Sequence, residues 1–67
     1  MVNTAKLMGK IYESGYNLGT ITDAMQLSRP TMTEKLNGKR DFKVSEIDKL
    51  CKILSIRLKE IPEYFFA

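Results

Sequence analysis

The residues best suited to chemistry stand close together in one segment, SRPTMTEKLNGKR, at positions 28–40. Ser28 can cap a helix, Arg29 follows it directly, and the segment ends in Asn-Gly followed by two cations. An arginine near the start of a helix can donate two parallel hydrogen bonds to guanine O6 and N7, and cations in a loop can bind phosphate. This layout is typical of the second helix of a helix-turn-helix, which enters the DNA major groove. The segment therefore predicts nucleic-acid recognition.

The surplus positive charge lies in the same part of the chain. The whole chain has a net charge of +3 at pH 7. Residues 28–43 hold five cations and two anions, whereas the other residues hold six of each sign. The cations are Arg29, Lys35, Lys39, Arg40 and Lys43, and the anions are Glu34 and Asp41. The candidate recognition helix and the loop after it therefore carry the whole excess, as expected for a surface that meets a polyanion.

The composition argues against an enzyme or a metal protein. The chain has no histidine and a single cysteine, Cys51. Catalytic arrangements that need histidine are therefore excluded, and zinc has no plausible ligand set. There is no glycine-rich phosphate loop, and 67 residues leave little room for both a core and a substrate pocket. We expect no enzyme activity, no cofactor, no metal and no small-molecule ligand.

The chain also lacks the features of a membrane or secreted protein. No apolar run approaches the roughly 18 residues of a membrane span. The N-terminus MVNTAKLMGK has no apolar signal region. Cys51 stands in an apolar helical row, which indicates a core thiol in a reducing compartment. We expect a cytoplasmic protein with one domain, residues 1–67.

Helices must position the candidate residues, because apolar residues recur at helical spacing nearly everywhere. We expect helices at about 3–14, 18–25, 29–36 and 44–54, and one further helical turn before Pro62. Asn17 and Ser28 are suitable caps for the second and third of them. No segment shows strand alternation. The expected fold is all-α: a compact bundle of four to five helices that contains a helix-turn-helix and ends in a short aromatic tail at 62–67.

The helical spacing also predicts the core. The inward-facing residues would be Leu7, Met8, Ile11, Tyr12, Leu18, Ile21, Met25, Met32, Leu36, Phe42, Val44, Ile47, Leu50, Cys51 and Leu54. Gly19 lies inside the second helix, where it costs on the order of 1 kcal/mol of helix propensity. We therefore expect another backbone or a phosphate to approach Gly19 closely.

One pattern in the chain also matches a known family. It reads Ser-Arg-x-Thr-φ-x-x-x-x-Asn-Gly-Lys-Arg, where φ is apolar, and it runs from Ser28 to Arg40. With this pattern the chain resembles the Cro and phage-repressor helix-turn-helix family, a five-helix group also called XRE-like, over about residues 4–61. The stretches KLNGKRDF and IPEYFF are most similar to short phage-encoded members from Gram-positive bacteria.

The chain departs from the family pattern at four positions. Thr22 stands where the family usually has alanine, and Gln26 stands where it has the glycine of a left-handed turn. Lys35 and Leu36 stand where an apolar residue and a glutamate are common, so the apolar anchor of the third helix has moved by one residue. These departures affect how the third helix would be rotated in the groove.

The resemblance implies a lambda-repressor-like DNA-binding domain, acting as a repressor that occludes a promoter. Its partner would be a double-stranded DNA operator, bound by a homodimer because one helix-turn-helix reads only about half a site. The base contacts would come from Arg29, Pro30, Thr31, Thr33 and Glu34. The phosphate contacts would come from Asn17, Thr20, Lys35, Asn37, Lys39, Arg40 and Lys43.

Two alternatives stay open at this point. Tyr64, Phe65 and Phe66 either form the dimer interface or fold back to complete a thin core; the core suits the first two and the interface suits Phe66. The function also has an alternative: an antirepressor or modulator that binds a phage repressor's DNA-binding domain through the same helix face. A toxin–antitoxin component is a third, weaker possibility.

Overall fold

The computed structural model describes residues 1–66, and every regular element in that range is a helix. The elements are α1 (Thr4–Glu13), α2 (Leu18–Met25), α3 (Arg29–Leu36), α4 (Val44–Leu54), the 3-10 helix η1 (Leu58–Glu60) and α5 (Ile61–Phe65). The all-α class is therefore confirmed, as are the expected bounds of the second, third and fourth helices. Of the expected tail at 62–67, only residue 67 lies outside the described residues.

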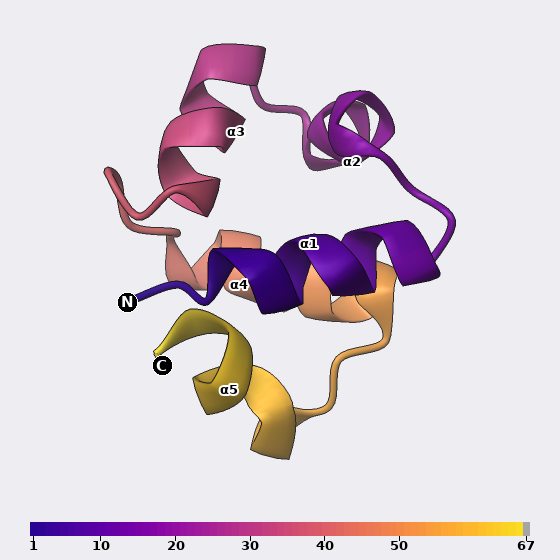
Figure 1. Ribbon diagram of the computed structural model, residues 1–67, viewed down its shortest axis with the longest axis vertical. Helices are drawn as coiled ribbons and strands as arrows, with labels where there is room; N and C mark the ends of the chain where they lie inside the picture. The colour runs from indigo at the N-terminus through magenta and orange to yellow at the C-terminus, as the bar shows by residue number, and fades with distance from the viewer. Residues whose placement is uncertain (67) are drawn as a thin grey trace.

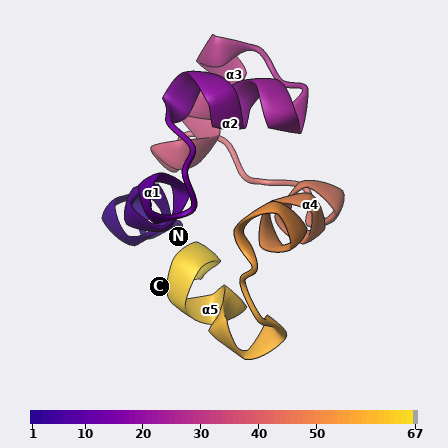
Figure 2. The same ribbon diagram turned by 90° about the vertical axis from the view of Figure 1, so that its right-hand side faces the viewer.

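The helices lie in three tiers (Figures 1 and 2). The pair α2 and α3 forms one end, α1 and α4 run side by side across the middle, and α5 closes the other end. The two chain ends meet, because the Asn3 N–H donates a hydrogen bond of 2.8 Å to the Tyr64 carbonyl and α5 packs against α1. The start of α3 thus lies at the end of the molecule farthest from α5, whereas the loop after α3 reaches back to α5, where Phe42 meets Phe65.

Side chains fix where the first three helices begin. Asn3 Oδ1 accepts from the Lys6 N–H at 3.1 Å. The side chains of Asn17 and Thr20 cap each other's backbone N–H groups at the start of α2, and the Ser28 hydroxyl accepts from the third residue of α3. Each cap provides an acceptor for an amide that has no intrahelical partner. The caps expected at the second and third helices are therefore present.

The turn between α2 and α3 uses a left-handed residue that is not glycine. Gln26 has φ 58° and ψ 37°. A residue with a Cβ pays on the order of 1 kcal/mol for this conformation. Its side chain is held by α4, because Lys49 Nζ donates to Gln26 Oε1 at 3.2 Å. The tight turn is thus kept despite the missing glycine.

One apolar core joins all the tiers. Its buried members are Leu7, Ile11, Ile21, Met25, Met32, Leu36, Phe42, Leu50, Cys51, Leu54, Ile56, Tyr64 and Phe65. The ring of Phe42 meets that of Phe65 edge-to-face, with centroids 5.6 Å apart. The expectation that Phe42 and Cys51 are core residues is confirmed, and burial raises the pKa of the Cys51 thiol.

Two expectations about apolar residues were wrong. Tyr12 is 59% exposed and Val44 is 85% exposed. Tyr12 lies about 100° around the helix from the buried Ile11, which is too far to reach the same core, and Val44 is the first residue of α4, at the edge of the packed region. The expected helical turn before Pro62 is present as η1, and a further helix, α5, runs through Pro62, because proline is tolerated in a first turn. Tyr64 and Phe65 are carried into the core by this helix.

Candidate nucleic-acid interface

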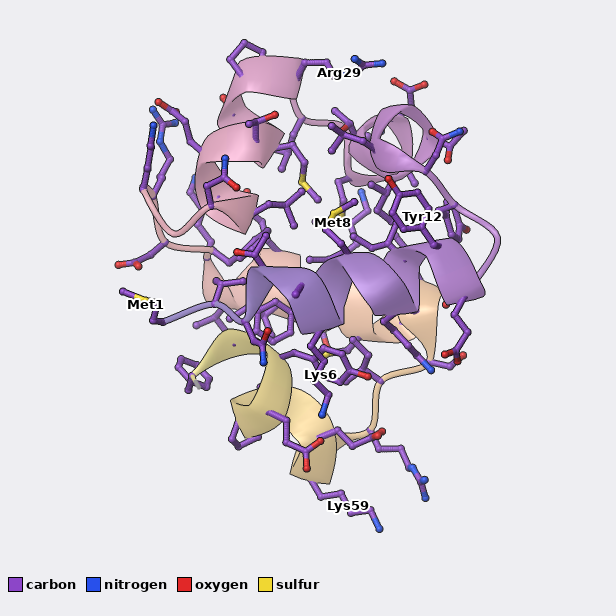
Figure 3. The ribbon with its side chains drawn as sticks, in the orientation of Figure 1. Met1, Lys6, Met8, Tyr12, Arg29 and Lys59 are labelled. Carbon is purple, nitrogen blue, oxygen red and sulfur yellow. The ribbon has the colours of Figure 1, made fainter. Side chains whose placement is uncertain are left out.

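The outward side of α3 presents the residues expected to contact bases. Arg29, Pro30 and Thr33 are exposed, and Thr31 and Glu34 are half-buried. The buried residues Met32 and Leu36 hold the opposite side of the helix on the core. Arg29 projects from the start of α3 at one extreme of the molecule, while Lys59 projects from the other (Figure 3). The five candidate base contacts therefore share a single short helix whose opposite side packs on the core.

Six of the seven residues expected to contact phosphate lie on the surface beside α3. They are Asn17, Thr20, Asn37, Lys39, Arg40 and Lys43. The first two lie at the start of α2, and the others lie at the end of α3 and in the loop before α4. Within residues 1–66, Lys39 and Lys43 take part in no ion pair. Both ammonium groups are therefore open to an anionic partner.

Lys35 is the exception, and the expectation that it contacts phosphate is corrected. Its side chain is buried, with only 3% of the residue exposed. Nζ lies 2.5 Å from Oε1 of Glu46, 3.3 Å from the Asp41 carbonyl oxygen and 5.9 Å from the centroid of the Phe42 ring. Because all contacts of the ammonium lie inside the protein, Lys35 connects α3 to the basic loop and, through its internal ion pair with Glu46, to α4.

The pKa of the Glu46 carboxyl is shifted by this internal ion pair. Burial acts to raise the pKa of the Glu46 carboxyl, but hydrogen bonds from the Lys35 ammonium and from the Lys43 N–H outweigh it and hold the pKa below its usual value. The Lys43 N–H lies 2.8 Å from Oε1 of Glu46. One carboxylate thus fixes both a helix and the backbone of a loop cation. No sequence pattern indicates this pair, since its members stand 11 residues apart on different helices.

The basic loop doubles back on the end of α3. Gly38 has φ 78°, a left-handed conformation that suits glycine. The N–H groups of Lys39 and Arg40 then donate to the Glu34 carbonyl at 2.9 and 3.3 Å. Nη2 of Arg40 lies 3.2 Å from Oε1 of Glu34, so that two residues expected to contact DNA are paired with each other. Loop reversal thus brings the Arg40 guanidinium onto the outward face of α3, beside Glu34.

Arg29 explains the glycine in α2. A Cβ placed on Gly19 would lie 3.0 Å from Nη2 of Arg29 and 3.3 Å from Oδ1 of Asn17. The group of the protein that approaches Gly19 is therefore a guanidinium and not another backbone segment. Arg29 lies across the start of α2 and so links the two helices of the candidate interface.

Gly19→Ala tests how firmly Arg29 is held there. We expect the free energy of unfolding to rise by about 0.5 kcal/mol, because alanine favours the helix by about 1 kcal/mol and the exposed guanidinium must move only a few tenths of an ångström. Urea denaturation measures the change. Gly9→Ala is the matched control, since a Cβ at Gly9 meets nothing within 4 Å, and it should give the full gain. A loss of stability in Gly19→Ala would show that Arg29 cannot move.

The aromatic tail contributes one exposed ring. Phe66 is 63% exposed, whereas Tyr64 and Phe65 are buried. Of the two alternatives for the tail, the core is therefore the one that holds for Tyr64 and Phe65, as the sequence favoured for these two residues. Phe66 borders a shallow cavity of about 310 Å³ that is also lined by Met1, Phe42 and Val44. Met1 and Val44 are each 85% exposed, so this face carries a concentration of exposed apolar side chains.

Two further observations concern other kinds of site. Among the described residues, no group of three or more histidine, cysteine or carboxylate side chains could hold a metal ion. None of the helices that the structure describes is long and apolar enough to cross a membrane.

Residues 1–66 form a small helical bundle in which the exposed cations Lys39, Arg40 and Lys43 follow α3. A family model described as "Protein of unknown function (DUF739)" matches residues 2–67. Because this match covers nearly the whole chain, the protein belongs to that family. No curated protein matches the sequence. The function therefore has to be argued from the chain itself.

Proposed function

We propose that this protein is a sequence-specific DNA-binding transcriptional regulator, a Cro-like repressor that acts by occluding a promoter. One observation carries the proposal: the exposed cations Lys39, Arg40 and Lys43 directly follow a short helix that has an exposed polar side and that is held by a preceding helix and a tight turn, and Arg40 pairs with Glu34 of that helix. A helix placed in this way can enter a major groove while the loop cations meet the flanking phosphates. The resemblance to the phage-repressor helix-turn-helix family supports the same function.

In this proposal the outward face of α3 reads bases. The Arg29 guanidinium would donate to guanine O6 and N7, and Pro30 or Thr31 would contact a thymine methyl group. Thr33 lies on the same face, and Glu34 can accept from cytosine N4. Because all five residues lie within two turns of one helix, they would read a few adjacent base pairs.

The phosphate contacts would flank this helix on both sides. Lys39, Arg40 and Lys43 would bind phosphates on one side together with Asn37. Asn17 and Thr20 would do so on the other, where the first amides of α2 favour an anion. Since Lys35 is neutralised internally, the electrostatic part of binding rests on three cations and not four.

We further propose that the repressor binds its operator in the cytoplasm as a homodimer. A single domain of net charge +3 reads about half a site and binds weakly at physiological salt. A two-fold interface would double both contributions. Of the three tail aromatics, Phe66 is the one exposed for such an interface.

Salt-dependent binding tests the proposal directly. Fluorescence anisotropy of a labelled random-sequence duplex should show affinity falling at least about 12-fold per domain between about 50 and 200 mM salt, because the counterions released by Lys39 and Lys43 alone give a slope of about −1.8, and a contact by Arg40 would add to it. Lys39→Ala should reduce the slope by about 0.9. Lys59→Ala is the matched control, since Lys59 is exposed at the opposite end of the molecule (Figure 3). Absence of binding at low salt would contradict direct DNA recognition.

A second candidate function is an antirepressor that binds a phage repressor's DNA-binding domain. The pair of Glu34 and Arg40 favours it, because it puts both signs of charge on the face that would meet the partner. A protein surface can satisfy an anion there more readily than a DNA backbone can. If no duplex binds at low salt, the α3 face should be tested instead for binding to the DNA-binding domain of a phage repressor.

A further inference from the structure

Glu34 occupies the junction between the two parts of the interface. It lies on α3, within the face proposed to read bases, and its carboxylate is 3.2 Å from the guanidinium of Arg40, which is proposed to bind phosphate. Both side chains are about half exposed, at 45% for Glu34 and 57% for Arg40. The same carboxylate can therefore face a base edge or hold Arg40, and a DNA phosphate would compete for the same guanidinium.

We propose that Glu34 is a specificity-determining residue that withholds Arg40 from DNA phosphate unless a base offers Glu34 a hydrogen-bond donor. The inference rests on the proposed DNA-binding function. On unselected DNA, a phosphate must displace Glu34 from Arg40, and the freed carboxylate then faces the polyanion without a partner. On a matched operator, an exocyclic amino group such as cytosine N4 replaces Arg40 as the donor to Glu34. Arg40 is then released to its phosphate.

The two interactions are of comparable strength, which is what lets the competition operate. An ion pair between half-exposed side chains is weak, because water screens it. A single phosphate contact is also modest and changes affinity only a few-fold in moderate salt. Neither interaction overwhelms the other, so the presence or absence of a donor to Glu34 determines whether Arg40 adds to the affinity.

The backbone allows the side chain to be altered without moving the loop. The Glu34 carbonyl, and not its carboxylate, accepts the N–H groups of Lys39 and Arg40. Glu34→Gln keeps this carbonyl and nearly the same side-chain shape while it removes the charge. Any change in DNA binding then reports on the charge of Glu34 and not on a displaced loop.

The test compares random duplex with an operator selected by the wild-type protein. Glu34→Gln should bind random duplex about fivefold more tightly at about 50 mM salt, with a slope steeper by about 0.9, since one more phosphate is contacted. It should gain much less on the operator, so the ratio of the two affinities falls. Glu13→Gln is the matched control, because Glu13 is an exposed residue at the C-terminal end of α1 and its carboxylate is paired with Lys10 at 3.4 Å.

Arg40→Gln distinguishes competition from simple repulsion. In the Arg40→Gln background, Glu34→Gln should change the affinity for random duplex no more than Glu13→Gln does. An equal gain with and without Arg40 would overturn the competition, as would a Glu34→Gln protein that binds like the Glu13→Gln control. In both cases the proposed DNA-binding function still stands if the affinity of the wild-type protein depends on salt and Lys39→Ala reduces the slope of that dependence. Failure of the wild-type protein to bind any duplex would overturn both proposals.

Discussion

Replacing Lys35 by methionine is expected to lower the free energy of unfolding by about 3 kcal/mol, which is a large share of the stability of so small a domain. Methionine fills nearly the same volume, so packing around Phe42 is largely kept. The loss comes from Glu46, whose half-buried carboxylate is left without the ammonium 2.5 Å away. An unpaired carboxylate in such a site costs more than the ion pair itself contributes.

Chemical denaturation measures this loss, and two variants control it. Lys39→Met removes an exposed cation from the loop and should change stability by less than about 0.5 kcal/mol. Adding Glu46→Leu to Lys35→Met should recover most of the stability, since no buried charge is then left without a partner. If Lys35→Met were as stable as the wild-type protein, Glu46 would have to reach water or another donor. The proposed stabilising role of the internal ion pair between Lys35 and Glu46 would then be wrong.

The dependence of stability on pH gives an independent check of the same pair. The folded pKa of Glu46 lies below its usual value of 4.5, so the pair stabilises the fold fully above that value. This contribution is lost as the pH falls from about 4.5 through the folded pKa. The wild-type protein should therefore lose more stability in this range than Glu46→Gln does. Parallel curves for the two proteins would contradict the assignment.

Arg29→Ala is expected to weaken binding to a selected operator by about 2 kcal/mol, or about thirtyfold, while affinity for random duplex changes only a few-fold. The reason is that a bidentate guanine contact exists only where the right base is present. Arg29→Lys should not restore operator affinity, because an ammonium cannot make two parallel hydrogen bonds in one plane. Anisotropy on both duplexes measures the difference.

A double-mutant cycle sharpens this second prediction. Each guanine of the operator is replaced in turn, and the replacement that costs the wild-type protein affinity should cost Arg29→Ala nothing further. Equal losses on operator and random duplex would instead mean that Arg29 binds phosphate. Its position across Gly19, at the start of α2, makes that outcome a structurally sensible alternative.

The local features of the fold could be predicted from the sequence because they depend on neighbouring residues. The caps at Asn17 and Ser28 each act within three residues, and the spacing of Met32 and Leu36 fixes the buried side of α3. The helix bounds from residue 18 to residue 54 followed from such local rules. They also placed Arg29 and Glu34 on the outward face, where the structure has them.

The remaining features depend on contacts between distant parts of the chain. Lys35 looked like a surface cation because its partner, Glu46, is on another helix and its burial depends on how α4 crosses α3. The ion pair of Glu34 and Arg40 forms only after the chain reverses at Gly38. The close approach at Gly19 was expected, but the approaching group was not, since Arg29 belongs to a different helix. Such pairings require the tertiary arrangement.

The hydrogen bond from Asn3 to Tyr64 has a consequence for biosynthesis. The first helix has its complete docking site only when α5 has also left the ribosome. Until then, the apolar side of α1, including Leu7 and Ile11, has part of its cover missing. The nascent chain therefore cannot complete its core before α5 has emerged, and folding should be cooperative.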